Sequence, residues 1–257
     1  MTNDNSPQVD ARIEAALAAD TPAGLVDAVM GKVFARWVSA PSSIGEVYVA
    51  FTRDGMQFLR PRGDEEIAEF TRAYRERFAR PLMSAEKAPA GLLPALHGRP
   101  SQTLAFDLSA LTAFERSVLE VTRRIPAGQA RPYGWVAREA GNPGAVRAVG
   151  SVLARNPVPL LVPCHRVVRA DGTPGEYIFG AAQKERLLRA EGMNLDEVVD
   201  LAGQGVHYLA SDTTNIVCFP TCRDARRITP RHRHGFGTVA EAVEAGYRPC
   251  RHCRPAA

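Results

Sequence analysis

The sequence lacks the features of a membrane or secreted protein. Its 257 residues contain no apolar run near the ~20 residues that span a bilayer. The first ten residues, Met1 to Asp10, are polar and carry no signal-peptide core. We therefore expect a protein of the bacterial cytoplasm that has no membrane partner.

Cysteine is also scarce, and the five residues present fall into two groups. Cys164 stands alone beside His165, whereas Cys218, Cys222, Cys250 and Cys253 form C-x3-C and C-x2-C pairs separated by 27 residues. Disulfides are rare in the cytosol, so these residues need a catalytic or metal-binding explanation. The paired spacing is typical of a tetrahedral zinc site. Zinc would also hold together a segment of about fifty residues, which is too short to form a large core.

Lysine is absent from Gly205 to the end of the chain. This segment has eight arginines and four acidic residues, a net charge of +4 that equals the net charge of the whole chain. A basic end favours a polyanionic partner such as DNA. An arginine-rich surface that only aids solubility explains the charge equally well.

Length and periodicity predict two or three small domains. Helical spacing of apolar residues predicts a helix over 8–40, broken at Thr21-Pro22, and another over 64–79. Residues 46–60 are typical of a β-hairpin that turns at Arg53-Asp54-Gly55. Residues 81–105 contain many Pro and Gly residues and are expected to be a connection.

Capping signals place the later helices. Thr112 and Glu115 form a capping-box signature for a helix that runs to Ile125. Asn142 followed by Pro143 predicts the N-cap of a helix that ends near Arg155. Further helices are expected over 132–140 and 181–191, and a linker over 193–205.

Cys164 follows the apolar run Asn156–Pro163 and precedes His165. A thiol in apolar surroundings is a poor nucleophile, because burial disfavours the thiolate. A neighbouring imidazole held by a third group is the usual activator. A Cys-His pair taken alone is more often a packed structural cysteine.

The surroundings of Cys164 resemble the O6-alkylguanine-DNA alkyltransferase family without a gap from Phe106 to Gly192. The shared motifs are Ile125-Pro126-Ala127-Gly128, Tyr133-Gly134-Trp135-Val136-Ala137, Gly141-Asn142-Pro143, Ala145 to Gly150, Asn156-Pro157-Val158-Pro159, Pro163 to Val168 and Glu191-Gly192. The segment before Phe106 resembles the leading domain of that family weakly. The resemblance implies an α/β plus α protein, with an RNase H-like α/β domain over 1–105 and a winged helix-turn-helix-like domain over 106–192.

The resemblance also implies direct-reversal repair of DNA. Cys164, His165 and Glu191 match an activating relay, Asn156 matches the residue that braces the turn, and Tyr133 matches a donor to guanine. The alkyl group ends as a stable thioether on Cys164, so each molecule acts once and needs no organic cofactor.

The same family flips the damaged nucleotide out of alkylated double-stranded DNA with a helix-turn-helix. Arg147 matches the residue that fills the gap, and small residues allow close approach, namely Gly144, Ala145, Ala148, Gly150 and Ser151. The matching substrate pocket contains Val162, Tyr177, Ile178 and Phe179. The protein is expected to act as a monomer.

Residues 206–257 are expected to form a separate domain, which from His207 to Pro255 resembles the zinc-binding, phosphotriester-repair domain of Ada proteins. The matching pieces are Thr213 to Cys218, Pro220, Cys222, Ala245 to Cys250 and Cys253. The resemblance implies that Cys218 both binds zinc and accepts a methyl group, and that Arg248 contacts DNA. Removing the metal should unfold this domain and leave the Cys164 chemistry measurable.

Two other functions remain open at this stage. The zinc domain can serve only as a structural or DNA-tethering module, or the protein can bind alkylation damage without repairing it. Binders of the second kind lack the nucleophilic cysteine, whereas Cys164 is present.

Overall fold

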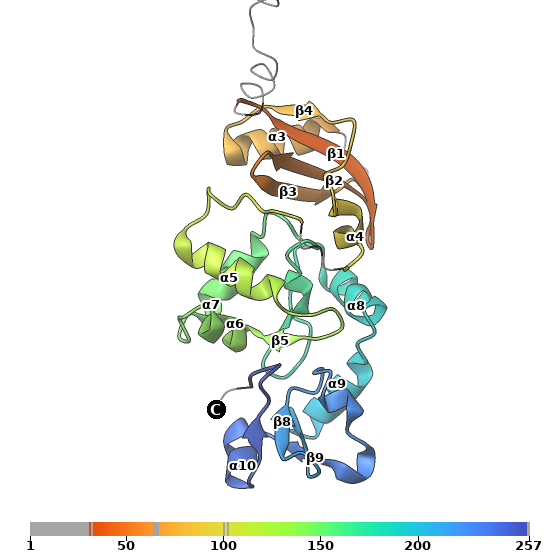
Figure 1. The fold of residues 1–257 in the computed structure, drawn as a ribbon, viewed down its shortest axis with the longest axis vertical. Coiled ribbons are helices and arrows are strands. Elements are labelled where there is room, and N and C mark those ends of the chain that lie inside the picture. The colour runs from red at the N-terminus through yellow and green to blue at the C-terminus, as the bar shows by residue number, and fades with distance from the viewer. Residues whose placement is uncertain (1–30, 32, 64–66, 100, 102, 256–257) are drawn as a thin grey trace, which may run out of the picture.

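The computed structural model describes residues 31, 33–63, 67–99, 101 and 103–255. Three parts follow one another along its longest axis: a sheet with helix α3, a central group of helices, and a second small sheet (Figure 1). Most of the helix expected over 8–40 lies outside the described residues. Within them, no helix is long and apolar enough to cross a bilayer.

The first sheet has the strand order β3-β2-β1-β4. Strands β2 (Gly45–Thr52) and β3 (Gly55–Pro61) form the predicted hairpin. The helix prediction is wrong for the segment that follows residue 34, because β1 (Ala35–Ser42) is a strand. Its backbone pairs with β2 from Arg36–Phe51 to Ser42–Gly45, and this hairpin pairing outweighs the local helical spacing.

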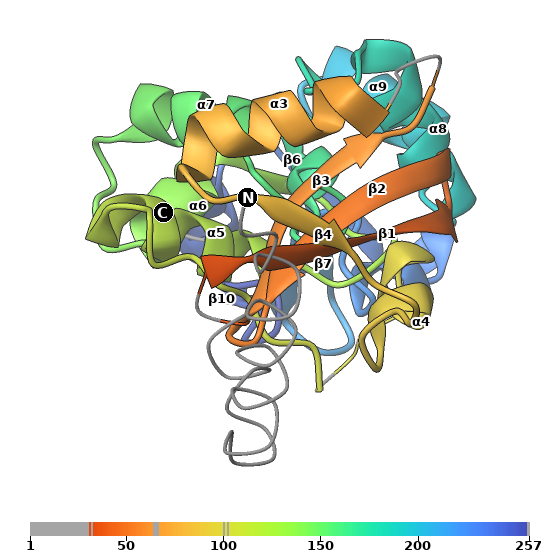
Figure 2. The same cartoon turned by 90° about the horizontal axis from the view of Figure 1, so that it is seen from above.

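Helix α3 (Ile67–Phe78) covers one face of this sheet, as Figure 2 shows from above. It buries Phe70 and Tyr74 against Tyr48 and Phe58. The segment 81–105 is more than a connection, which corrects the expectation from its Pro and Gly content. It contains β4 (Leu82–Ser84), which pairs with β1, and the short helix α4 (Leu92–Leu96).

The central part contains α5 (Ala113–Arg123), α6 (Tyr133–Glu139) and α7 (Val146–Ala154). The capping box of Thr112 and Glu115 is present at the start of α5, as predicted. The predicted N-cap at Asn142 is wrong, since α7 begins after Ala145. The Asn142 carbonyl accepts a hydrogen bond from the Ala145 N–H at 3.0 Å, so the Pro-Gly pair between them forms a turn.

Short elements frame the Cys164 region and lead to the last part. Strands β5 (Arg131–Pro132) and β6 (Val167–Val168) pair in parallel, and η1 (Cys164–Arg166) is a single 3-10 turn. Helix α8 (Ala181–Ala190) follows. The segment expected to be a linker contains helix α9 (Leu195–Gly203), which the Asn194 side chain caps.

The last sheet has the order β10-β8-β7-β9. Its strands are β7 (Tyr208–Ser211), β8 (Ile216–Cys218), β9 (Arg233–Phe236) and β10 (Arg248–Pro249). Helix α10 (Val239–Glu244) and the turns η2 (Ala225–Arg227) and η3 (Pro230–His232) complete this part. Because β8 ends at Cys218 and β10 leads into Cys250, their parallel pairing brings the two cysteine pairs together.

Candidate active site and metal site

Cys164 lies in turn η1 and is buried, with 4% of its surface exposed. The Asn156 amide donates to the Cys164 sulfur at 3.2 Å and to the Val162 carbonyl at 2.9 Å. The Asn156 side-chain oxygen accepts from the Val158 N–H, so this one residue braces the whole turn before the thiol. Burial raises the pKa of Cys164 to about 11, and the hydrogen bond from Asn156 opposes that rise.

A buried lysine stands close to the thiol and was missed by sequence reasoning. The Lys184 ammonium donates to the Val167 carbonyl at 2.6 Å and to the Glu176 carbonyl at 3.2 Å. Burial lowers the pKa of Lys184 to about 8, whereas the Cys164 thiolate opposes that shift. Helical periodicity places a lysine of α8 on the surface by default, so only the fold reveals that this one points inward.

His165 and Glu191 meet as the relay predicts. The His165 Nε2 lies 3.0 Å from Glu191 Oε1. Burial holds the pKa of His165 below its ordinary value, so the ring is neutral near pH 7. An ionised carboxylate can only accept, so the ring proton sits on Nε2 and the Nδ1 lone pair is free. Nδ1 is buried and has no hydrogen-bond partner among the described residues.

Glu191 is held from three sides. Arg166 donates to both of its oxygens at 2.7–3.2 Å, and the Gly128 N–H donates to Oε2 at 3.0 Å. Burial alone would raise the pKa of Glu191, but the hydrogen bonds from His165 and Arg166 outweigh it and hold the pKa at about 2. Arg166 and Gly128 stand inside recognised motifs, although no pattern in the sequence indicated this contact.

The expected substrate pocket gathers around the same turn. The Tyr177 ring contacts two other rings edge-on. Its centroid lies 6.0 Å from that of the His165 ring and 5.4 Å from that of the Phe179 ring. The Tyr177 hydroxyl is buried without a partner among the described residues, and burial raises its pKa. The centroid of the Tyr133 ring lies 5.9 Å from the Lys184 ammonium nitrogen. Val162 is fully buried, and Ile178 is half-buried.

Helix α7 presents the expected small residues outward. Gly144, Ala148 and Ser151 are exposed together with Arg147, and Ala145 and Gly150 are half-buried. The opposite face packs inward through Val149, Val152 and Leu153. The outer face is therefore free to approach a partner closely.

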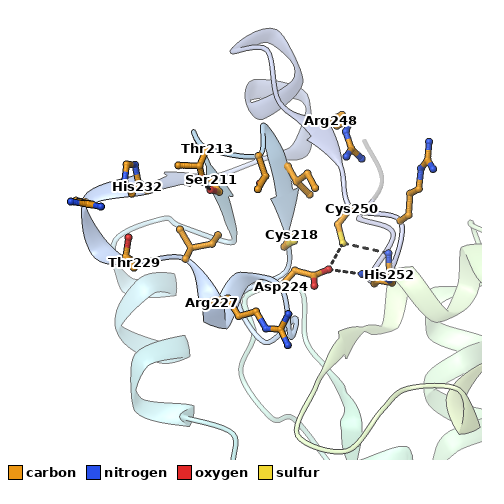
Figure 3. Close-up of a pocket in the computed structure, with 15 residues that line it drawn as sticks. Ser211, Thr213, Cys218, Asp224, Arg227, Thr229, His232, Arg248, Cys250 and His252 are labelled. Atoms are coloured by element: carbon orange, nitrogen blue, oxygen red, sulfur yellow. Dashed lines mark hydrogen bonds and ion pairs between the residues drawn. The ribbon is translucent and has the colours of Figure 1, made fainter.

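The four cysteines of the last part form a metal site. The sulfurs of Cys218, Cys222, Cys250 and Cys253 all lie within 4.8 Å of one another and are buried. Ligands at the Zn–S length of about 2.3 Å stand about 4 Å apart around a tetrahedral ion, so the donor set and the spacing fit zinc. Asp224 and His252 lie beside Cys250, as the dashed lines in Figure 3 show.

A cavity of about 630 Å³ opens next to this cluster. Its wall includes Cys218 and Cys250 together with the exposed arginines Arg227, Arg231, Arg248 and Arg251 (Figure 3). Of the four cysteines of the cluster, Cys218 and Cys250 therefore line the same cavity as these arginines.

The geometry of Glu191 predicts the effect of removing its charge. Glu191→Gln should lower the free energy of unfolding by about 3 kcal/mol, because it leaves Arg166 buried without a counter-charge. The depressed pKa of Glu191 adds stability above about pH 4.5 that is lost as pH falls through 2. The difference between the two proteins in urea unfolding should therefore shrink in acid. The exposed pair of Asp196 with Arg189 provides a control, and Asp196→Asn should change stability little.

Comparison with known families identifies both parts. Residues 113–193 match the family described as 6-O-methylguanine DNA methyltransferase, DNA binding domain. Residues 199–256 match the metal-binding domain of Ada.

Individual relatives agree with these matches. The methylated-DNA–protein-cysteine methyltransferase of Methanothermobacter thermautotrophicus is 46% identical over 96 residues, which are 35% of this chain and 53% of that protein. The bifunctional transcriptional activator/DNA repair enzyme Ada of Escherichia coli is 40% identical over 121 residues, 43% of this chain and 34% of Ada. The chain spans about half the length of the curated methyltransferases it matches.

A solved structure agrees as well. The structure superposes on the crystal structure of the Mycobacterium tuberculosis O6-methylguanine methyltransferase with a TM-score of 0.50. The match covers 61% of this chain and 92% of the methyltransferase chain, with 29% sequence identity. The mixed α/β fold is therefore similar to that of an alkyltransferase. Residues 113–193 are therefore similar to the DNA-binding domain of 6-O-methylguanine DNA methyltransferases, and residues 199–256 are similar to the metal-binding domain of Ada.

Proposed function

We propose that this protein repairs DNA by direct reversal, moving the alkyl group of O6-alkylguanine in double-stranded DNA onto Cys164. One observation carries the proposal: a buried thiol lies beside a neutral imidazole whose Nδ1 lone pair is left free by an ionised carboxylate. This is the arrangement by which a triad activates a nucleophile.

The chemistry forms one bond and breaks one. His165 accepts the Cys164 proton, through a water, and the thiolate attacks the alkyl carbon. The sulfur–carbon bond forms as the carbon–O6 bond breaks, and guanine leaves with the electron pair while Tyr133 supplies a proton or hydrogen bond. The buried Lys184 ammonium stabilises the thiolate as it forms. The product is a thioether, so Cys164 is used once.

The outer face of α7 is proposed to enter the minor groove. In this arrangement α6 and α7 act as a winged helix-turn-helix-like unit within 106–192, and Arg147 fills the space of the flipped nucleotide. The description of the matching family as a DNA-binding domain supports this step. The first sheet with α3 would be the RNase H-like domain of residues 1–105. We further propose a cytoplasmic monomer, since free thiols and a thiolate metal site suit a reducing compartment.

The metal part is proposed to accept a second methyl group at Cys218, from a DNA methylphosphotriester. Zinc, when bound, keeps its sulfur ligands deprotonated. Cys218 and the arginines share one cavity wall, which suits a phosphate-bearing substrate. The alternative is a module that only tethers the protein to DNA.

Counting methyl groups tests the main proposal. Wild-type protein treated with DNA that carries both lesions should gain two methyl groups, on Cys164 and Cys218, by mass spectrometry with peptide mapping. Cys164→Ser should keep the fold and lose the O6-guanine transfer, because it removes only the nucleophilic sulfur. Stoichiometric O6 repair by this variant would refute the assignment, and no methyl group on the wild type would indicate a damage binder.

Arg147→Ala should separate DNA handling from chemistry. The alkyl-transfer rate on duplex should fall about tenfold or more, because unstacking a nucleotide costs a few kcal/mol. Reaction with the free O6-alkylguanine base should be unchanged. Arg186→Ala removes an exposed arginine of α8 and serves as the matched control. Equal losses by Arg147→Ala on both substrates would contradict the wedge.

Cys218→Ser separates the two functions considered for the metal part. Metal analysis of the wild type should find one zinc per chain, and Cys218→Ser should lose methyl uptake from phosphotriester DNA. Binding of wild-type protein to undamaged DNA should weaken steeply with salt, since arginine–phosphate contacts release counterions. One bound zinc with an unmodified Cys218 in the wild type would leave the tethering module as the function of this part.

A further inference from the structure

The loop from Pro126 to Arg131, between α5 and β5, is shared by the two sites. On one side, the Gly128 N–H donates to Glu191 Oε2 at 3.0 Å. On the other, the Gly128 carbonyl accepts a hydrogen bond from the guanidinium of Arg226, which lies in turn η2 of the metal part. A continuous line of contacts therefore runs from Arg226 through Gly128 and Glu191 to His165, the neighbour of Cys164.

The loop is tightly enclosed at Gly128. This residue has a positive φ of +70°, and a Cβ there would lie 2.5 Å from the Glu191 carbonyl oxygen. On the opposite side the same Cβ would lie 3.4 Å from the Arg226 guanidinium. Gly128 therefore lies between Glu191 and Arg226 with no room for a side chain.

Thr221 of the metal part holds the same loop at Ala130, two residues after Gly128. Its hydroxyl accepts from the Ala130 N–H at 3.0 Å and donates to the Ala130 carbonyl at 3.1 Å. Thr221 is buried and directly precedes the ligand Cys222, whose carbonyl accepts from the Arg226 N–H at 3.1 Å. Both contacts to the loop therefore start from residues that the metal-binding turn holds.

The last residue of the loop, Arg131, places a buried positive charge near the metal site. Arg131 is 2% exposed, and its guanidinium lies 5.4 Å from the centre of the Phe219 ring, between Cys218 and Cys222 in sequence. Burial lowers the pKa of Arg131, and the negative charges of the four cysteines oppose that shift. Four thiolates around zinc carry a net charge of −2, so Arg131 and the cluster attract each other across the interface.

We propose that the metal part completes the alkyl-transfer site. Arg226 and Thr221 are positioning residues that hold the 126–131 loop so that Gly128 orients Glu191 and, through it, the tautomer of His165. This inference rests on the proposed transfer to Cys164 and adds a second contribution of the metal part, independent of methyl transfer to Cys218.

Arg226→Ala tests the inference in the full-length, zinc-loaded protein. The substrate is the free O6-alkylguanine base, so that contacts between arginine and DNA do not enter. Loss of a residue that orients another typically costs ten- to hundredfold, and we expect alkylation of Cys164 to slow about tenfold. Arg226→Lys should recover part of the rate, because an ammonium can still donate to Gly128.

A matched control and a direct probe of His165 complete the experiment. Arg223→Ala removes an exposed arginine three residues before Arg226 whose contacts are with Asp224 and His252, and its rate should equal that of the wild type. In ¹⁵N-histidine NMR spectra, Arg226→Ala should reduce the fraction of His165 that carries its proton on Nε2. A role in stability alone would leave that fraction unchanged.

The outcomes are distinguishable. A wild-type rate and an unchanged His165 tautomer in Arg226→Ala would overturn the inference while leaving transfer to Cys164 intact. No alkylation of Cys164 in the wild type would instead refute the proposed function. If Arg226→Ala fails to fold or to bind zinc, Thr221→Val carries the same test, since it keeps the side-chain shape and removes both hydrogen bonds to Ala130. A wild-type rate and tautomer there would overturn the inference equally.

Discussion

The ionised carboxylate of Glu191 is the group on which the rest of the site depends. A buried charge costs several kcal/mol unless it is paired and hydrogen-bonded. Its three partners come from two places in the chain: Arg166 and His165 from η1, and Gly128 from the loop after α5. Satisfying this one charge therefore fixes the loop, the turn that carries Cys164 and the end of α8 relative to one another.

The burial of Cys164 and the His165 tautomer that Glu191 fixes together explain how the site holds an unreactive thiol at rest. Burial keeps the pKa of Cys164 near 11, so the thiol is protonated before substrate arrives. Glu191 fixes the proton of His165 on Nε2 and leaves Nδ1 as the base, while Lys184 supplies a nearby positive charge. In the proposed transfer, His165 therefore has to accept the Cys164 proton as the thiolate forms.

Short sequence patterns correctly predicted those structural features that depend on neighbouring residues. The Thr112 capping box and the hairpin turning at Arg53-Asp54-Gly55 depend on residues close in sequence, and the structure contains both. The spacing within each cysteine pair predicted a metal site, and the pairing of β8 with β10 brings the two pairs together. The strand conformation of β1 was not predicted, because it depends on pairing with β2 on one side and with the distant β4 on the other. The inward direction of Lys184 could not be predicted either, because it depends on carbonyls of distant residues. The family resemblance, rather than spacing, located Glu191 opposite His165.

The greatest departure from the sequence-based picture is the contact between the central part and the metal part. The segment expected to separate them forms α9, and Glu197 of that helix accepts from Arg233 of β9 at 2.7 Å. One buried apolar cluster includes Ile125 and Trp135 together with Phe219 and the four cysteines. Coupling free energies are reciprocal, so whatever order the metal part imposes on the Gly128 loop, the Glu191 site imposes equally on the metal part. Two sites that share a loop and a core cannot be energetically independent, even though their chemistry uses different sulfurs.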